Sequence, residues 1–266
     1  MPLPLRITHV APEPLETLPF LTIPPGGDEP QEYALPFYAG SISGLPTELD
    51  AVVVASDLQG VVRRGGQERL LGQAAADTLA VLLELYFPHL RPARTLALLS
   101  GDLYADLTRR GQSGNPLPAW QSFAAVCGQV VGIAGNHDDF GGVPPELPAN
   151  AQFLDNGHVS VHGLLIAGLS GIIGRSDKPF RRSEADYLKA LANLLRPQPA
   201  LLLTHPSPAW AGYQGEAQLT ALLAKTPAPL LCCGHSHWPT QEPLTLPGGT
   251  QVLNADTKVY ILLNAD

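Results

Sequence analysis

The sequence has no long hydrophobic run. In its 266 residues no apolar stretch reaches the roughly 18 residues that a membrane-spanning helix needs. Prolines interrupt the first ten residues, MPLPLRITHV, so we expect no signal peptide and no membrane association. Cysteines are also scarce: Cys127, Cys232 and Cys233 are an odd number and two are adjacent, which argues against a disulfide framework. A reducing, cytoplasmic location is therefore expected.

Basic residues are few as well. The chain holds 16 Lys and Arg against 24 Asp and Glu, a net charge of −8, and residues 1–50 alone carry −6. Proteins that bind nucleic acid usually show a stripe of basic residues, whereas only short pairs of basic residues, such as Arg63–Arg64, occur here. A ligand with few phosphates fits this charge balance better than a duplex. Neither G-x-x-x-x-G-K-[ST] nor G-x-G-x-x-G is present, so the usual nucleotide-binding loops are excluded.

What is present is the composition of a globular protein, with 45% hydrophobic and 15% charged residues. Residues 1–50 contain ten of the 27 prolines, which excludes long helices there. We interpret residues 1–50 as an acidic, Pro-rich arm of strands and loops packed on the body, and residues 51–266 as the main domain. The Pro-rich stretch 143–148 is expected to be a loop.

Strands and helices alternate in the main domain. Short β-branched or leucine-rich runs predict buried strands, and apolar residues at helical spacing predict helices between them. Expected strands are 51–57, 95–102, 129–136, 200–205 and 229–235; expected helices are 67–87, 117–126, 184–195 and 215–225. Residues 151–169 and 241–263 are predicted to form consecutive strands joined by turns. This order indicates an α/β protein with mixed sheets.

Polar clusters follow five of the apolar runs, at the carboxyl ends of strands where α/β sheets bind ligands. Each cluster alone has an ordinary explanation, such as a turn or a core histidine. Together they bring carboxylates, amides and imidazoles to one edge, which is a donor set for divalent transition metals. The clusters are Asp57-Leu58-Gln59, Gly101-Asp102, Gly135-Asn136-His137-Asp138, Thr204-His205-Pro206 and Gly234-His235-Ser236-His237.

The order of these clusters resembles the calcineurin-like metallophosphoesterases, whose signature is D-x-H, G-D, G-N-H-[DE], a lone H and G-H-x-H. The resemblance spans about residues 51–240. It implies two mixed β-sheets packed as a sandwich with flanking helices, a four-layer α/β/β/α fold. It also implies two divalent ions at one edge. By position, Asp57, Gln59, Asp102 and His237 would hold one ion, and Asp102, Asn136, His205 and His235 the other. His137 would act on the leaving group.

Two positions depart from the family pattern. Gln59 stands where the first motif usually has His, and its amide oxygen favours Mn²⁺, with Fe²⁺ or Zn²⁺ also compatible with the set. Some Mn²⁺-dependent pyrophosphatases that share D-x-Q remain enzymes. Ala105 replaces the acid of the G-D-x-x-D-R motif of protein phosphatases, which argues against that activity.

The resemblance implies hydrolysis of a phosphoester, with a phosphodiester or pyrophosphate of a small molecule favoured, by a hydroxide shared between two ions. Arg63, Arg64 and Arg175 are candidates for binding the substrate. Two alternatives remain open. One is a non-catalytic scaffold that binds metal or a protein partner, suggested by Gln59 and Ala105, and the other is a nuclease.

Overall fold

A large mixed β-sheet forms one half of the protein in this computed structural model, which describes residues 4–24, 26–109, 111–141 and 146–266. Its strand order is β6-β5-β2-β3-β18-β4-β7-β8-β9, with β1 paired to β3. The strands are β1 (Arg6–Val10), β2 (Glu16–Thr22), β3 (Gln31–Ser43), β4 (Ala51–Ser56), β5 (Val61–Arg64), β6 (Gln67–Leu70), β7 (Thr95–Leu99), β8 (Gln129–Gly132), β9 (Ala151–Phe153) and β18 (Lys258–Asn264).

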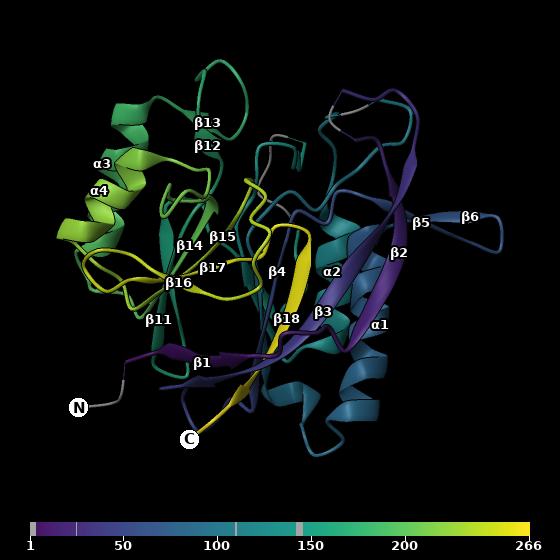
Figure 1. Cartoon of the computed structure of the whole chain (residues 1–266), viewed down its shortest axis with the longest axis horizontal. Coiled ribbons are helices and arrows are strands. Elements are labelled where there is room, and N and C mark those ends of the chain that lie inside the picture. The colour runs from purple at the N-terminus through teal and green to yellow at the C-terminus, as the bar shows by residue number, and fades with distance from the viewer. Residues whose placement is uncertain (1–3, 25, 110, 142–145) are drawn as a thin grey trace.

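A second, six-stranded sheet packs against the first, and helices cover both outer faces, so the chain has four layers (Figure 1). Its order is β10-β11-β14-β15-β17-β16, and a separate pair, β12 and β13, lies outside it. The strands are β10 (Gly157–Val161), β11 (Leu164–Leu169), β12 (Ile172–Ile173), β13 (Arg181–Arg182), β14 (Leu201–Pro206), β15 (Leu230–Gly234), β16 (Leu244–Thr245) and β17 (Gln251–Asn254). The helices are α1 (Leu71–Tyr86), α2 (Leu117–Val126), α3 (Glu184–Leu195), α4 (Ala217–Lys225) and the 3₁₀ turn η1 (Pro92–Arg94).

Strand alternation explains the layering. Val52 and Val54 of β4 join a buried cluster with Leu203 and Cys232 of the second sheet. Val53 lies on the other face of β4 and belongs to the cluster that contains residues of α1 and α2. All six residues of β4 are buried, as expected for a strand covered on both faces. Helices α3 and α4 cover the opposite face of the second sheet. The α/β/β/α prediction is therefore confirmed.

Residues 4–50 contribute β1, β2 and β3 to the same large sheet as β4. Strand β3 pairs in parallel with β18, which in turn pairs antiparallel with β4. The register with β18 runs from Phe37 to Ile42, so the first half of β3 extends beyond β18 and pairs with β2. The hydrogen-bonded sheet is thus continuous across residue 50.

One element boundary differs clearly from the sequence-based expectation. Helix α1 begins at Leu71, not at residue 67, because Gln67–Leu70 pairs with Val61–Arg64 as a β-hairpin. Gly65 and Gly66 form its turn with φ of 60° and 78°, a backbone conformation that glycine adopts without strain. The loop expected at 143–148 lies partly outside the described residues. Among the described residues, none of the helices is long and apolar enough to cross a membrane.

Candidate metal centre

The predicted ligands lie where strands of both sheets end, and three of them have unusual backbone conformations. Asp57 follows β4, Asp102 follows β7 and His235 follows β15. Their φ angles are 52°, 55° and 67°, in the left-handed region that non-glycine residues rarely occupy. Such strain is concentrated at functional sites, where it turns side chains towards a common point.

Asp102, His205 and His235 form a compact cluster. One ligand atom from each lies within 4.8 Å of the others. His205 Nε2 lies 3.2 Å from Asp102 Oδ2 and 4.0 Å from Asp57 Oδ1, and the His205 and His235 rings are 5.0 Å apart. Strands β4, β7, β14 and β15 therefore bring together residues as far apart in sequence as Asp57 and His235.

Three histidines are each oriented by a hydrogen bond at the same ring nitrogen, Nδ1. Nδ1 of His205 contacts the Ser100 carbonyl oxygen at 2.8 Å, and Nδ1 of His237 contacts Asp256 Oδ2 at 2.9 Å. Nδ1 of His137 lies 2.9 Å from the Gly111 carbonyl oxygen. Because these oxygens accept a hydrogen bond from Nδ1–H, each ring in its neutral form has its lone pair on Nε2. That is the arrangement in which protein histidines bind metals.

The two aspartates are held by the loops around them. Asp57 Oδ2 accepts hydrogen bonds from Ser56 Oγ at 2.7 Å and from the His235 amide at 2.9 Å. Asp102 Oδ1 accepts the His137 amide at 2.8 Å, and Asp102 Oδ2 accepts Gln59 Nε2 at 3.2 Å. Gln59 therefore presents its amide nitrogen to Asp102, and its oxygen can reach an ion beside Asp102 only if the amide turns.

The buried charges shift one another's pKa. Burial raises the pKa of Asp57 well above its usual value, against the attraction of His205. Burial opposes charge on both Asp102 and His205, but their mutual attraction prevails, so the pKa of Asp102 falls and that of His205 rises. Burial and the charge on His205 lower the pKa of His235 to about 4. In the absence of metal, Asp102 and His205 therefore stabilise each other's charged form.

The donor set fits divalent ions. Asn136 Oδ1, which belongs to a predicted ligand, is a buried polar atom without a hydrogen-bond partner. Buried polar atoms are normally paired, so this oxygen has the character of a ligand atom. Asp57, Gln59, Asp102, His235 and His237 line one cleft of about 840 Å³. Oxygen and imidazole donors together suit Mn²⁺, Fe²⁺ or Zn²⁺.

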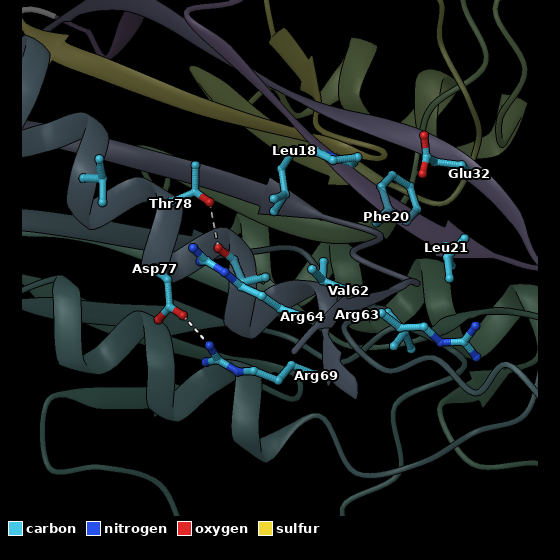
Figure 2. A pocket seen from close by; sticks show the side chains of 14 residues that line it. Leu18, Phe20, Leu21, Glu32, Val62, Arg63, Arg64, Arg69, Asp77 and Thr78 are labelled. Atoms are coloured by element: carbon cyan, nitrogen blue, oxygen red, sulfur yellow. Dashed lines mark hydrogen bonds and ion pairs between the residues drawn. The ribbon is translucent and has the colours of Figure 1, made fainter. Parts of the chain in front are cut away.

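The three arginine candidates lie elsewhere. Arg63 and Arg64 line a separate cleft of about 440 Å³ between the β5–β6 hairpin and α1 (Figure 2). Arg63 pairs with Glu68 at 2.7 Å, and Figure 2 shows its guanidinium directed away from that of Arg64. Arg175 pairs with Asp177 at 2.7 Å, and its side chain is 79% exposed. The structure does not bring these arginines to the metal-ligand cleft.

His137 lies in the cleft and finds a partner that the sequence did not reveal. Ala105 stands in place of the acid of the protein-phosphatase motif, and the next residue in the sequence, Asp106, is an acid. Asp106 accepts hydrogen bonds from the amide and hydroxyl of Thr108, and it is the Gly111 carbonyl that holds His137. A backbone carbonyl carries no sequence signature, so motif analysis could not have identified it.

Two further carboxylates support the site. Asp138 accepts the amides of Asp102, Leu103 and Gly135 at 2.8–2.9 Å and so ties two ligand loops together. Burial raises the pKa of Asp138 to about 7, and the neighbouring Asp102 carboxylate adds to the shift. Asp138 belongs to the G-N-H-D motif, whereas Asp256, the partner of His237, lies in no motif and was missed.

Comparisons with known proteins bear on the family and the fold of the chain. Residues 51–239 match the calcineurin-like phosphoesterase family. The crystal structure of TT1561 from Thermus thermophilus has a TM-score of 0.51 and 16% identity, covering 79% of this chain and 90% of that one. A hypothetical protein from the same organism has a TM-score of 0.44 and 18% identity, covering 77% and 75%. No curated protein matches the chain.

The match spans more than half of the sequence, so the chain belongs to the calcineurin-like phosphoesterase family. The family implies metal-dependent hydrolysis of phosphoesters. The resemblance seen in the sequence is confirmed, and TT1561 shows the same fold at low identity. At 16% identity the structural likeness carries no information about substrate.

Proposed function

We propose that this protein is a metal-dependent phosphoesterase that hydrolyses a small phosphorylated molecule, with a phosphodiester or pyrophosphate bond as the favoured target. The observation that carries the proposal is the cluster of Asp102, His205 and His235 within 4.8 Å, of which Asp102 and His235 line a cleft that also holds His137. Two divalent ions, Mn²⁺ favoured, would be held by Asp57, Gln59, Asp102 and His237, and by Asp102, Asn136, His205 and His235. When bound, they would supply an activated water and neutralise phosphate charge.

The side chains of the site would have two further roles, attracting cations and donating a proton. The Asp57 and Asp102 carboxylates concentrate negative charge at the strand ends, which attracts cations. His137 is oriented through Nδ1 by the Gly111 carbonyl, so Nε2 is the free ring nitrogen, and in the doubly protonated form of the ring it carries the proton that a leaving oxygen would receive. Three buried, unbridged cysteines support the proposal of a cytoplasmic protein.

Charge in the cleft supports a small substrate over nucleic acid. Among the described lining residues, Lys258 is the single Lys or Arg, and Asp57, Asp102, Asp106 and Asp256 are acidic. Lys258 Nζ donates to the carbonyl oxygens of Trp238 at 2.9 Å and Asp256 at 3.3 Å. A cleft with so few free cations depends on bound metal to attract phosphate and offers little to a long polyanion.

The experiment that tests the proposal is elemental analysis of the purified protein, followed by turnover of bis-p-nitrophenyl phosphate with Mn²⁺ added. We expect two ions per chain and Mn²⁺-dependent hydrolysis, both lost when the metal is removed by chelation. One ion or none, with no turnover at saturating Mn²⁺, would favour a non-catalytic scaffold. The orientation of Gln59, whose amide nitrogen faces Asp102, is the observation that favours a non-catalytic scaffold.

Asp256 provides a test of ligand orientation. Replacing Asp256 by Asn removes the carboxylate that holds His237 Nδ1, so we expect Mn²⁺ affinity to fall by about 10- to 100-fold. Competition with a chelating dye measures this affinity without relying on activity. Asp106→Asn is the matched control, because Asp106 lines the same cleft but bonds to Thr108. An equal loss in both variants would contradict a specific role for Asp256.

A further inference from the structure

The cleft that holds the metal ligands has one wall built by a part of the chain outside the family match. Phe20, Ile23, Pro24, Tyr33, Ala34, Pro36 and Tyr38, from β2, β3 and their connection, line it together with the aspartates and histidines. The family match begins at residue 51. This wall is therefore a feature of this chain's own β2–β3 hairpin.

The register of the sheet explains why this wall extends beyond β18. Strand β3 is paired with β18 from Phe37 onwards, while residues 31–36 pair with β2 and extend past the start of β18. We call residues 17–22 and 31–36 the overhang. Figure 1 shows the β2–β3 connection rising above β18, on the same side as the loops that follow β14 and β15. The overhang thus stands beside the strand ends that carry the metal ligands.

The overhang presents an aromatic surface. Tyr33 is 43% exposed, and its ring rests on Phe20, with centroids 6.1 Å apart and a tilt of 34°. Phe20 is almost fully buried and contacts the backbone region of Gly60, so the exposed ring has a fixed support. Large aromatic rings exposed in a cleft, with proline rings beside them, favour flat apolar groups.

We propose that the overhang is a subsite for a flat ring, an aryl group or nucleobase, attached to the phosphoester, and that Tyr33 packs against it. This inference rests on the proposed function, since the phosphate must be held at the metal-ligand cluster. A single cleft of about 840 Å³ contains both the cluster and the overhang, enough for a phosphate and an organic group together. The few cations among the described residues that line the cleft agree with a neutral organic group next to one or two phosphates.

The test compares two probes that differ in one ring: adenosine 5′-monophosphate and ribose 5-phosphate, titrated into the Mn²⁺-loaded protein by calorimetry. We expect the ring to strengthen binding at least tenfold, which corresponds to about 1.4 kcal/mol. Tyr33→Ala should reduce this ratio below threefold, leaving the affinity for ribose 5-phosphate unchanged. Tyr33→Phe keeps the ring and should keep the ratio, as should Tyr86→Ala, which removes an exposed ring of α1 outside the cleft.

The outcomes separate this inference from the proposed function. Equal affinity for the two probes in the unaltered protein would overturn the subsite while leaving phosphate binding intact, and so would a ratio that survives Tyr33→Ala. A tenfold ratio that depends on Tyr33, in a protein that does not hydrolyse bis-p-nitrophenyl phosphate, would support the subsite and refute hydrolysis. Failure of both probes to bind, in a protein that hydrolyses bis-p-nitrophenyl phosphate, would overturn the subsite and leave the proposed function standing.

Discussion

Asp102→Asn should reduce Mn²⁺-dependent turnover of bis-p-nitrophenyl phosphate by about a thousandfold, the largest loss expected from any single substitution. Asp102 is the residue that both proposed ion sites share. Its two oxygens also receive the His137 amide and Gln59 Nε2, and His205 lies 3.2 Å away. Asparagine has nearly the same shape as aspartate but lacks the charge. Its NH₂ group would also face one of these hydrogen-bond donors, where the carboxylate has an acceptor oxygen. Kinetics and elemental analysis of the same preparation measure the effect.

The matched control for Asp102 is Asp77→Asn. Asp77 lies on α1, pairs with Arg69 and lines the other cleft, the one drawn in Figure 2. This substitution makes the same chemical change on the surface, where an exposed ion pair contributes little. We expect unchanged turnover and two ions per chain. If Asp102→Asn retained both metal and activity, the two-ion assignment would be wrong.

Gly135→Ala should cause the second-largest loss, about a hundredfold in kcat/KM. A Cβ atom at position 135 would overlap Asp102 Oδ1 and would lie 2.5 Å from Asp102 Cγ and 2.7 Å from the Asp102 amide nitrogen. The backbone of the G-N-H-D loop approaches the shared carboxylate too closely for any side chain. The carboxylate must therefore shift, and a displacement of about 1 Å in a catalytic group is enough for a loss of this size.

Gly157→Ala is the control for this substitution. Gly157 begins β10, and an added Cβ would meet only Leu154 at 3.8 Å, an ordinary contact. We expect normal kinetics and an unchanged melting temperature. Thermal unfolding of Gly135→Ala should be measured alongside its kinetics, because overpacking also destabilises by about 1–3 kcal/mol. Full activity in a folded Gly135→Ala protein would show that the loop does not position Asp102.

Much of the fold was predictable because runs of hydrophobic residues mark the segments that become buried. Helix α2 lies where helical spacing placed it, and β4, β14 and β15 lie within a residue or two of their apolar runs. The second strand of the hairpin at Val61–Leu70 was assigned to a helix, because it is largely exposed and lacks strong alternation. Its pairing depends on a neighbouring strand and on Gly65–Gly66, which the helical pattern downstream obscured.

The sequence by itself determined the α/β class, the family and the order of the polar clusters, because these depend on local patterns and on residue types in fixed spacing. Only the tertiary structure decided which groups meet. It placed Asp256 against His237 and the Gly111 carbonyl against His137, and it separated Arg63 and Arg175 from the cleft. It also set Tyr33 in the same cleft as metal ligands, through a register in which β3 extends past the start of β18. Such contacts join residues far apart in the chain, and no local pattern encodes a distance between them.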